Sequence, residues 1–208
     1  MDSKTKSDER ALKDPAEKGE PDPGLLAAML EAREQRWARR MMLAEKHPSL
    51  ISLTLCVPLP QRLSPEGKLF LRQAARELEE NLRQAGFAPE EAEYLEGADG
   101  LAVFLPCRSE AEALKRFCVK EEETLPAGRL LDIDVTKEGG LPIGRAELGL
   151  PPRKCFLCGR PAAECVAGAR HAPEAAAAYV EALLARQRGK TTKKGEYDGT
   201  ADPFVNGQ

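Results

Sequence analysis

The chain has 208 residues, 42% of them hydrophobic and 31% charged, which is typical of one globular domain with polar ends. Its 31 basic and 34 acidic residues give a net charge of −3, so the overall charge favours neither a nucleic acid polymer nor an anionic membrane as a partner. The most apolar stretch, residues 50–60, is far shorter than the roughly 20 residues that cross a bilayer. The sequence therefore predicts no membrane span.

Both ends of the chain are polar. Residues 1–22 carry almost no large apolar side chains, and residues 188–208 are rich in glycine and charge, so we expect disordered tails around a folded domain over 23–187. The N-terminus lacks the apolar stretch of a secretory signal, which predicts a cytoplasmic protein. In that setting the six cysteines are expected as free thiols or metal ligands rather than as disulfides.

The first predicted helix runs from Gly24 until Pro48 closes it. Its apolar residues recur at spacings of three, four and seven and form one stripe, which consists of Leu26, Leu30, Trp37, Met41 and Ala44. Aliphatic residues at alternate positions then predict a strand over 51–58. A second helix is predicted from Ser64 to Gly86, because serine caps free amides and glycine accepts the left-handed conformation that ends helices.

The rest of the chain continues this alternation. We expect strands over 91–96 and 101–105, a helix opening at 109–112, a strand over 129–135, an extended segment over 141–147 and a final helix over 173–187. This order predicts a single-domain α+β fold. Its core would be the ferredoxin-like β-α-β-β-α-β arrangement, with an added hairpin strand and flanking helices.

Two aspartates lie close together in the predicted strand over 129–135. Strand alternation places Leu131, Ile133 and Val135 on one face and both Asp132 and Asp134 on the other. Two neighbouring carboxylates repel each other unless a cation lies between them, and hard oxygen ligands suit Mg²⁺ or Mn²⁺. The alternative is an exposed edge strand whose aspartates are solvated or paired with nearby arginines.

A cysteine and histidine cluster follows, with the spacing C-x2-C-x6-C-x5-H. Its members are Cys155, Cys158, Cys165 and His171. Three thiolates and one imidazole make a plausible tetrahedral set for structural Zn²⁺, and four protein ligands would leave no open position for catalysis. Free thiols are the alternative, and a redox-active C-x-x-C pair is a third interpretation.

These motifs together resemble a known family. GRLLDIDV, a glycine-rich turn, LPPRKCFLC and the downstream Cys165 and His171 are similar to the holo-ACP synthase family of citrate lyase, the apo-citrate lyase phosphoribosyl-dephospho-CoA transferases. The resemblance spans roughly residues 25–185. It implies an enzyme that takes 2'-(5''-triphosphoribosyl)-3'-dephospho-CoA, releases pyrophosphate and leaves the prosthetic group on a serine of the apo acyl carrier subunit.

The resemblance also implies site residues. Asp132 and Asp134 become the metal-binding catalytic pair, and Glu147 becomes a third carboxylate, with a solvated surface residue as its alternative. The basic residues expected to hold the triphosphate are Arg129, Arg145, Arg153 and Lys154. Members of the family carry a histidine where Leu125 stands and a Ser-Arg pair where this chain has Gly144-Arg145, so no role of that histidine or serine transfers.

Two further interpretations complete the expectations. Arg33, Arg36 and Arg40 share one face of the first predicted helix, which could dock the carrier or be an ordinary solvated face. The chain could also be a non-enzymatic, zinc-stabilised adaptor for carrier or lyase subunits, or could transfer a nucleotide to a different acceptor. An adaptor would release no pyrophosphate, whereas a different acceptor would preserve the metal dependence.

Overall fold

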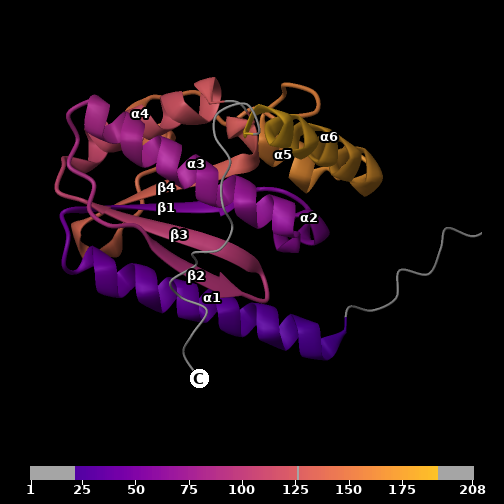
Figure 1. Ribbon diagram of the computed structural model, residues 1–208, viewed down its shortest axis with the longest axis horizontal. Coiled ribbons are helices and arrows are strands. Elements are labelled where there is room, and N and C mark those ends of the chain that lie inside the picture. The colour runs from indigo at the N-terminus through magenta and orange to yellow at the C-terminus, as the bar shows by residue number, and fades with distance from the viewer. Residues whose placement is uncertain (1–21, 126, 192–208) are drawn as a thin grey trace, which may run out of the picture.

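A four-stranded antiparallel sheet organises the residues that the computed structural model describes, 22–125 and 127–191 (Figure 1). The strands lie in the order β2-β3-β1-β4, and all three neighbouring pairs are antiparallel. Their bounds are Ser49–Leu55 for β1, Glu93–Gly97 for β2, Gly100–Cys107 for β3 and Leu131–Lys137 for β4. The strand β4, which carries the two aspartates, is therefore an edge strand.

The predicted β-α-β-β-α-β core is confirmed. Helix α3 (Pro65–Gln84) connects β1 to β2, and α4 (Ala111–Thr124) connects β3 to β4. Each helix thus joins two strands that have one strand between them in the sheet, as the ferredoxin-like arrangement requires. A short helix, α2 (Leu59–Leu63), precedes α3 and was not predicted.

Helices α3 and α4 cover one face of the sheet, and the main hydrophobic core lies between them and the strands (Figure 1). Alternate residues of the strands, such as Leu53, Val103 and Ile133, point into this core. The predicted inward face of α3 is confirmed, because Leu71, Ala74, Ala75, Leu78 and Leu82 are all buried. Ser64 caps the helix by accepting a hydrogen bond from the Gly67 amide at 3.0 Å.

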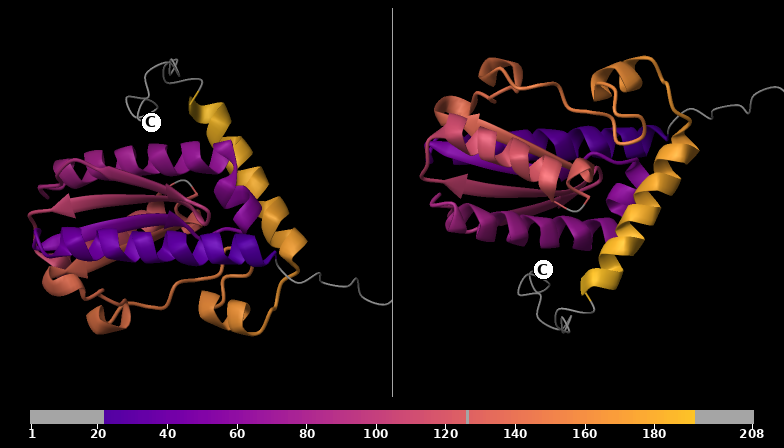
Figure 2. Two further views of the ribbon diagram at one scale, coloured as in Figure 1. Left: turned by 90° about the horizontal axis from the view of Figure 1, so that it is seen from below. Right: turned by 90° about the horizontal axis from the view of Figure 1, so that it is seen from above.

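Helix α1 (Pro23–Ala44) lies along the opposite face of the sheet (Figures 1 and 2). A Cβ atom added to Gly97 would lie 2.7 Å from the Cβ of Ala32, so this glycine allows the helix to approach the β2–β3 turn closely. The predicted apolar stripe of α1 does not pack on the sheet along its whole length. Leu26, Leu30 and Trp37 are exposed. The buried residues of α1 are Ala32, Leu43 and Ala44, and of these Ala44 alone belongs to the predicted stripe.

The prediction of an added hairpin strand over 141–147 was wrong. Only one isolated bridge, between Thr136 and Pro142, pairs this segment with β4. Pro142 has no amide hydrogen to continue a ladder, and the chain turns into the short 3-10 helix η3 (Ala146–Leu148). At the other end of β4, the 3-10 helix η1 (Gly128–Leu130) occupies the first residues of the predicted strand, so β4 begins at Leu131.

The C-terminal part contains the unpredicted short helix α5 (Ala162–Ala167) and the predicted final helix α6 (Pro173–Thr191). Helix α6 crosses the ends of α2 and α3, where Val180 and Leu184 are buried (Figure 2). It continues past the predicted end at Gln187, and the remainder of both predicted tails lies outside the described residues. Within the part of the chain that is described, no helix has the length and apolarity of a membrane span.

Candidate active site

Asp132 and Asp134 lie on the face of β4 that is turned toward α1. Leu131, Ile133 and Val135 point to the opposite face and are buried in the main core, which confirms the alternation that the sequence predicted. On the neighbouring strand β1, Thr54 pairs with Asp132 and Ser52 pairs with Asp134. Two carboxylates and two hydroxyls therefore share one surface of the sheet.

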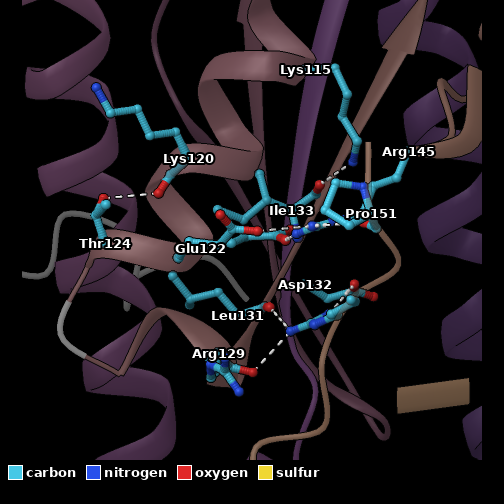
Figure 3. A network of polar contacts seen from close by, with 12 residues as sticks. Lys115, Lys120, Glu122, Thr124, Arg129, Leu131, Asp132, Ile133, Arg145 and Pro151 are labelled. Atoms are coloured by element: carbon cyan, nitrogen blue, oxygen red, sulfur yellow. Dashed lines mark hydrogen bonds and ion pairs between the residues drawn. The ribbon is translucent and has the colours of Figure 1, made fainter. Parts of the chain in front are cut away.

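The free edge of β4 is held by side chains at the residue between the two aspartates. The Ile133 amide donates to Glu122 at 3.1 Å, and Lys115 donates to the Ile133 carbonyl at 2.7 Å (Figure 3). Both side chains come from α4, and both are buried. Because an edge strand has unpaired backbone groups, these bonds satisfy them and fix the backbone that carries the acidic pair.

A cleft of about 290 Å³ separates α1 from this surface. The sheet contributes Asp132 and Asp134 from β4, Ser52 and Thr54 from β1, and Ala102 and Phe104 from β3. Helix α1 contributes four residues from two successive turns, which are Arg33, Arg36, Trp37 and Arg40. Carboxylates on one wall thus face guanidinium groups on the other.

The electrostatics of the cleft disfavour two ionised carboxylates. Although Asp134 is exposed, desolvation of its carboxylate is the largest effect that raises the pKa of Asp134, followed by the charge of Asp132. The charges of Lys115 and Arg40 act in the opposite direction. A divalent cation would relieve the same repulsion, and the donor set of carboxylate and hydroxyl oxygens is the kind that Mg²⁺ or Mn²⁺ prefers. The residues present therefore fit such an ion.

Among the predicted phosphate-binding residues in the described part of the chain, Arg153 is the one that forms a hydrogen bond to the acidic pair. Its Nη1 donates to Asp132 at 2.8 Å, and its Nη2 donates to the carbonyl oxygens of Arg129 and Leu131. These bonds also cover the exposed backbone edge of β4 where the strand begins. In the alternative to the metal site, an aspartate pairs with a nearby arginine such as Arg129 or Arg145, but among the described residues Asp132 pairs with Arg153 instead.

The other predicted phosphate-binding residues line a second, separate cleft of about 230 Å³. Arg145 lies there in ion pairs with Glu122 and Glu123, and Arg129 donates to the Cys155 carbonyl at 3.2 Å. Lys154 lines the same cleft. Because Arg153 lines this second cleft and also bonds to Asp132, it lies between the two.

Glu147 is not brought to the acidic pair. Its carboxylate accepts a hydrogen bond from the Gly144 amide at 2.7 Å and so closes the turn that precedes η3. It lines neither of the two clefts. In this arrangement the side chain acts locally, and the role of Glu147 as a third carboxylate stays a prediction.

The four predicted zinc ligands come together. One ligand atom from each of Cys155, Cys158, Cys165 and His171 lies within 4.8 Å of every other. The Cys155 sulfur lies 3.5 Å from the His171 Nε2, and the Cys158 sulfur lies 3.4 Å from that of Cys165. Such a Cys3His group can hold a structural metal such as zinc.

The pKa values of two thiols of the cluster, Cys155 and Cys165, are shifted in opposite directions. Burial acts to raise the pKa of Cys155, but hydrogen bonds from the Leu157 and Cys158 amides outweigh it and leave that pKa lowered. Burial and the neighbouring cysteines raise the pKa of Cys165 to about 11. A bound cation would favour the thiolate form of each ligand, because a metal ligand must be deprotonated.

Sequence patterns did not indicate that residues of α1 line this cleft. Arg33, Arg36 and Arg40 were considered only as a docking face, and Trp37 was assigned to an apolar stripe. Their helical spacing indicates a shared face. However, the direction of that face depends on how α1 crosses the sheet, which helical periodicity does not encode.

The fold and the cleft define a class of site, in which two carboxylates and facing arginines suit a phosphate ester together with a divalent cation. The family model for apo-citrate lyase phosphoribosyl-dephospho-CoA transferase matches residues 25–187. The protein of that name from Citrobacter koseri is 33% identical over 157 residues, which are 75% of this chain and 86% of the relative. Over the same length and shares, the Shigella boydii serotype 18 and Escherichia coli O157:H7 proteins are 32% identical.

The chain therefore belongs to the apo-citrate lyase phosphoribosyl-dephospho-CoA transferase family, as the motifs predicted. This is a family of enzymes, so the expectation of an enzyme rather than a non-catalytic adaptor is confirmed.

Proposed function

We propose that this protein transfers the phosphoribosyl-dephospho-CoA group from its triphosphate precursor to a serine of the apo acyl carrier subunit of citrate lyase. Membership of the family supports the reaction, and one observation supports its location. Asp132 and Asp134 share a cleft with the arginines of α1, so carboxylates that suit a cation and guanidinium groups that suit phosphates converge on one volume. We expect the reaction to take place in the cytoplasm, where citrate lyase subunits would be modified.

In the proposed reaction the serine oxygen of the carrier forms a bond to the phosphorus that is attached to the ribose. The bond from that phosphorus to the next bridging oxygen breaks, and pyrophosphate leaves with the electron pair. The serine proton passes to solvent. The products are a phosphodiester on the carrier and free pyrophosphate, so no oxidant or further reactant is needed.

Asp132 and Asp134 would hold Mg²⁺ or Mn²⁺, which when bound neutralises charge on the phosphates and on the leaving pyrophosphate. Arg40, whose charge already acts on Asp134, would bind phosphate oxygens from the opposite wall. Arg153 holds Asp132 in place through its hydrogen bond. Glu122 and Lys115 hold the strand between the aspartates, so the chain arranges the acidic pair before substrate enters.

The second cleft supplies further cations near the same strand. Arg129 and Lys154 lie in it beside Arg153, and we assign them to the distal phosphates that leave as pyrophosphate. Arg145 is held by Glu122 and Glu123, so its proposed contribution is to fix Glu122 rather than to bind phosphate in this arrangement. The Cys3His group is proposed as a structural zinc site.

The test is incubation of the purified protein with apo carrier, the triphosphate precursor and Mg²⁺, followed by intact-mass spectrometry of the carrier and assay of pyrophosphate. We expect the carrier to gain the mass of the prosthetic group at a serine, with one pyrophosphate released for each carrier modified. An adaptor would give neither product. Release of pyrophosphate with the mass gain on another acceptor would instead support the alternative transferase.

A further inference from the structure

Trp37 lies at the cleft in an arrangement that packing does not explain. It is 58% exposed, although it is a large aromatic residue on a helix that covers the sheet. It lines the same cleft as Asp132 and Asp134, and Arg33 and Arg40 lie one turn before and after it. An exposed aromatic face beside arginines offers a surface on which a planar, anionic ligand can stack.

Two buried polar atoms in the cleft have no partner among the described residues. They are the Nε of Arg40, on the α1 wall, and the Oγ of Ser52, on the sheet. Because a buried polar atom without a hydrogen bond is costly, such atoms indicate that another group completes the site. One is a donor and the other can donate or accept, so a ligand with acceptor oxygens satisfies both.

The three arginines of the α1 wall differ in whether another side chain pairs with them. Arg36 pairs with the buried Asp99 and thereby ties α1 to the β2–β3 turn. Within residues 22–125 and 127–191, Arg33 and Arg40 make no hydrogen bond or ion pair. These two guanidinium groups are therefore available to an anionic ligand, whereas that of Arg36 is not.

We infer that the α1 side of this cleft binds the nucleoside phosphate part of the substrate, with the base stacked on Trp37 and phosphate oxygens held by Arg33 and Arg40. The inference rests on the proposed function, because it names which part of the precursor the cleft holds. A cleft of about 290 Å³ is at the lower end of ligand-site volumes and suits one nucleotide, so the pantetheine arm extends outside it. The base would lie toward Ala102 and Phe104 and the phosphates toward β4.

The chain offers a direct probe of this site, because Trp37 is its only tryptophan. Titration of the full chain with 3'-dephospho-CoA, which lacks the reactive triphosphate, should quench tryptophan fluorescence to saturation. Pantetheine, which lacks the nucleotide, should produce no quenching over the same range. Isothermal titration calorimetry gives the dissociation constant for variants that have lost the fluorophore.

Variants of Trp37 and Arg33 distinguish the contribution of aromatic stacking to nucleotide binding from the contribution of charge. We expect Trp37→Leu to weaken 3'-dephospho-CoA binding by about tenfold and Trp37→Phe to preserve most of the affinity, because every base can stack on an aromatic face. Arg33→Ala should weaken 3'-dephospho-CoA binding, but should leave the weaker binding of adenosine unchanged. The matched control is Arg39→Ala, on the same helix, because Arg39 pairs with Glu93 and lines a different groove.

The inference is overturned if Trp37→Leu binds 3'-dephospho-CoA within twofold of the unchanged chain, or if pantetheine quenches as strongly as the nucleotide. A Trp37→Leu variant that keeps nucleotide affinity but needs more carrier for half-maximal rate would show that this face docks the carrier instead. Saturable nucleotide binding without carrier modification would count against the proposed function alone. Carrier modification with unaltered binding by Trp37→Leu would count against this inference alone.

Discussion

Arg153 donates a hydrogen bond to Asp132 across 2.8 Å and thereby connects the cysteine and histidine segment to the acidic strand. The connection is short in sequence, because Arg153 lies two residues before Cys155. A further bond runs from Arg129 to the Cys155 carbonyl, so the segment is attached to the start of β4 twice. The Cys3His group can therefore influence the acidic pair through covalent and hydrogen-bonded contacts, although it is not part of the cleft.

Replacement of Arg153 tests this connection. We expect Arg153→Ala to lower turnover by about 10²-fold, because it frees Asp132 and uncovers the carbonyls at the start of β4. Arg153→Lys should recover only part of the rate, since lysine cannot form the same set of parallel bonds. The measurement is the initial rate of pyrophosphate release with saturating carrier, and unchanged rates in both variants would contradict the positioning effect.

The Cys3His group should hold about one zinc per chain in protein that is purified without chelator, as measured by elemental analysis. We expect Cys158→Ser to lose the metal and to lower Tm by roughly 5–10 °C, which corresponds to about 3 kcal/mol for a domain of this size. Cys56→Ser is the matched control, because Cys56 is exposed and lies outside the cluster. Protein without zinc, and equal Tm values for the two variants, would indicate plain thiols.

The thiols outside the cluster should differ in reactivity. Cys107 and Cys118 are buried, and burial raises the pKa of Cys107 to about 12 and also raises the pKa of Cys118. Desolvation also raises the pKa of Cys56, but Cys56 is exposed, so we expect iodoacetamide to label the native protein at Cys56 at pH 8 and to spare both buried positions. Peptide mass spectrometry after a brief reaction checks the pattern, and labelling of Cys118 before Cys56 would be inconsistent with this core.

The stability of the metal-free protein should depend on the protonation of Asp134. The pKa of Asp134 is raised in the folded chain by desolvation and by Asp132, so the folded state binds this proton more tightly than the unfolded state does. The stabilisation that this proton gives is complete below the unfolded pKa and is lost as the pH rises through the folded pKa.

We therefore expect metal-free Asp134→Asn to have a higher Tm than the unchanged chain at pH 7 and nearly the same Tm near pH 3, below the unfolded pKa of the Asp134 carboxyl. Excess Mg²⁺ should stabilise the unchanged chain more than the variant. Thermal unfolding with and without the cation checks both statements. A variant that is less stable than the unchanged chain at pH 7 without metal would show that the two carboxylates do not repel each other as described.

Local sequence signals were sufficient for the elements that carry the acidic pair and the core. Ser64, Pro65 and Gly86 marked the ends of the second predicted helix because capping and left-handed conformations are properties of single residues. The period of two in β4 placed both aspartates on one face without knowledge of the partner strand. The cluster spacing likewise predicted which four ligands would meet.

The remaining features depend on tertiary packing. The face of α1 that turns toward β4 is set by the close approach of Ala32 to Gly97 and by the Arg36–Asp99 pair, and these partners are far apart in sequence. The segment over 141–147 had the composition of a strand, but Pro142 and the Glu147–Gly144 bond favour turns. The choice of Arg153 as the partner of Asp132 also depends on where the chain returns to β4.

The central claim is that the acidic pair carries the transfer, and its most direct test is single-turnover modification of apo carrier by Asp134→Asn, followed by intact-mass spectrometry. Glu138→Gln is the matched control, because Glu138 is an exposed acid just beyond the end of β4 and lines neither cleft. We predict that Asp134→Asn loses at least about 10²-fold in rate with its fold intact, while the control keeps its rate. An Asp134→Asn protein that modifies the carrier within about twofold of the unchanged rate would contradict the account.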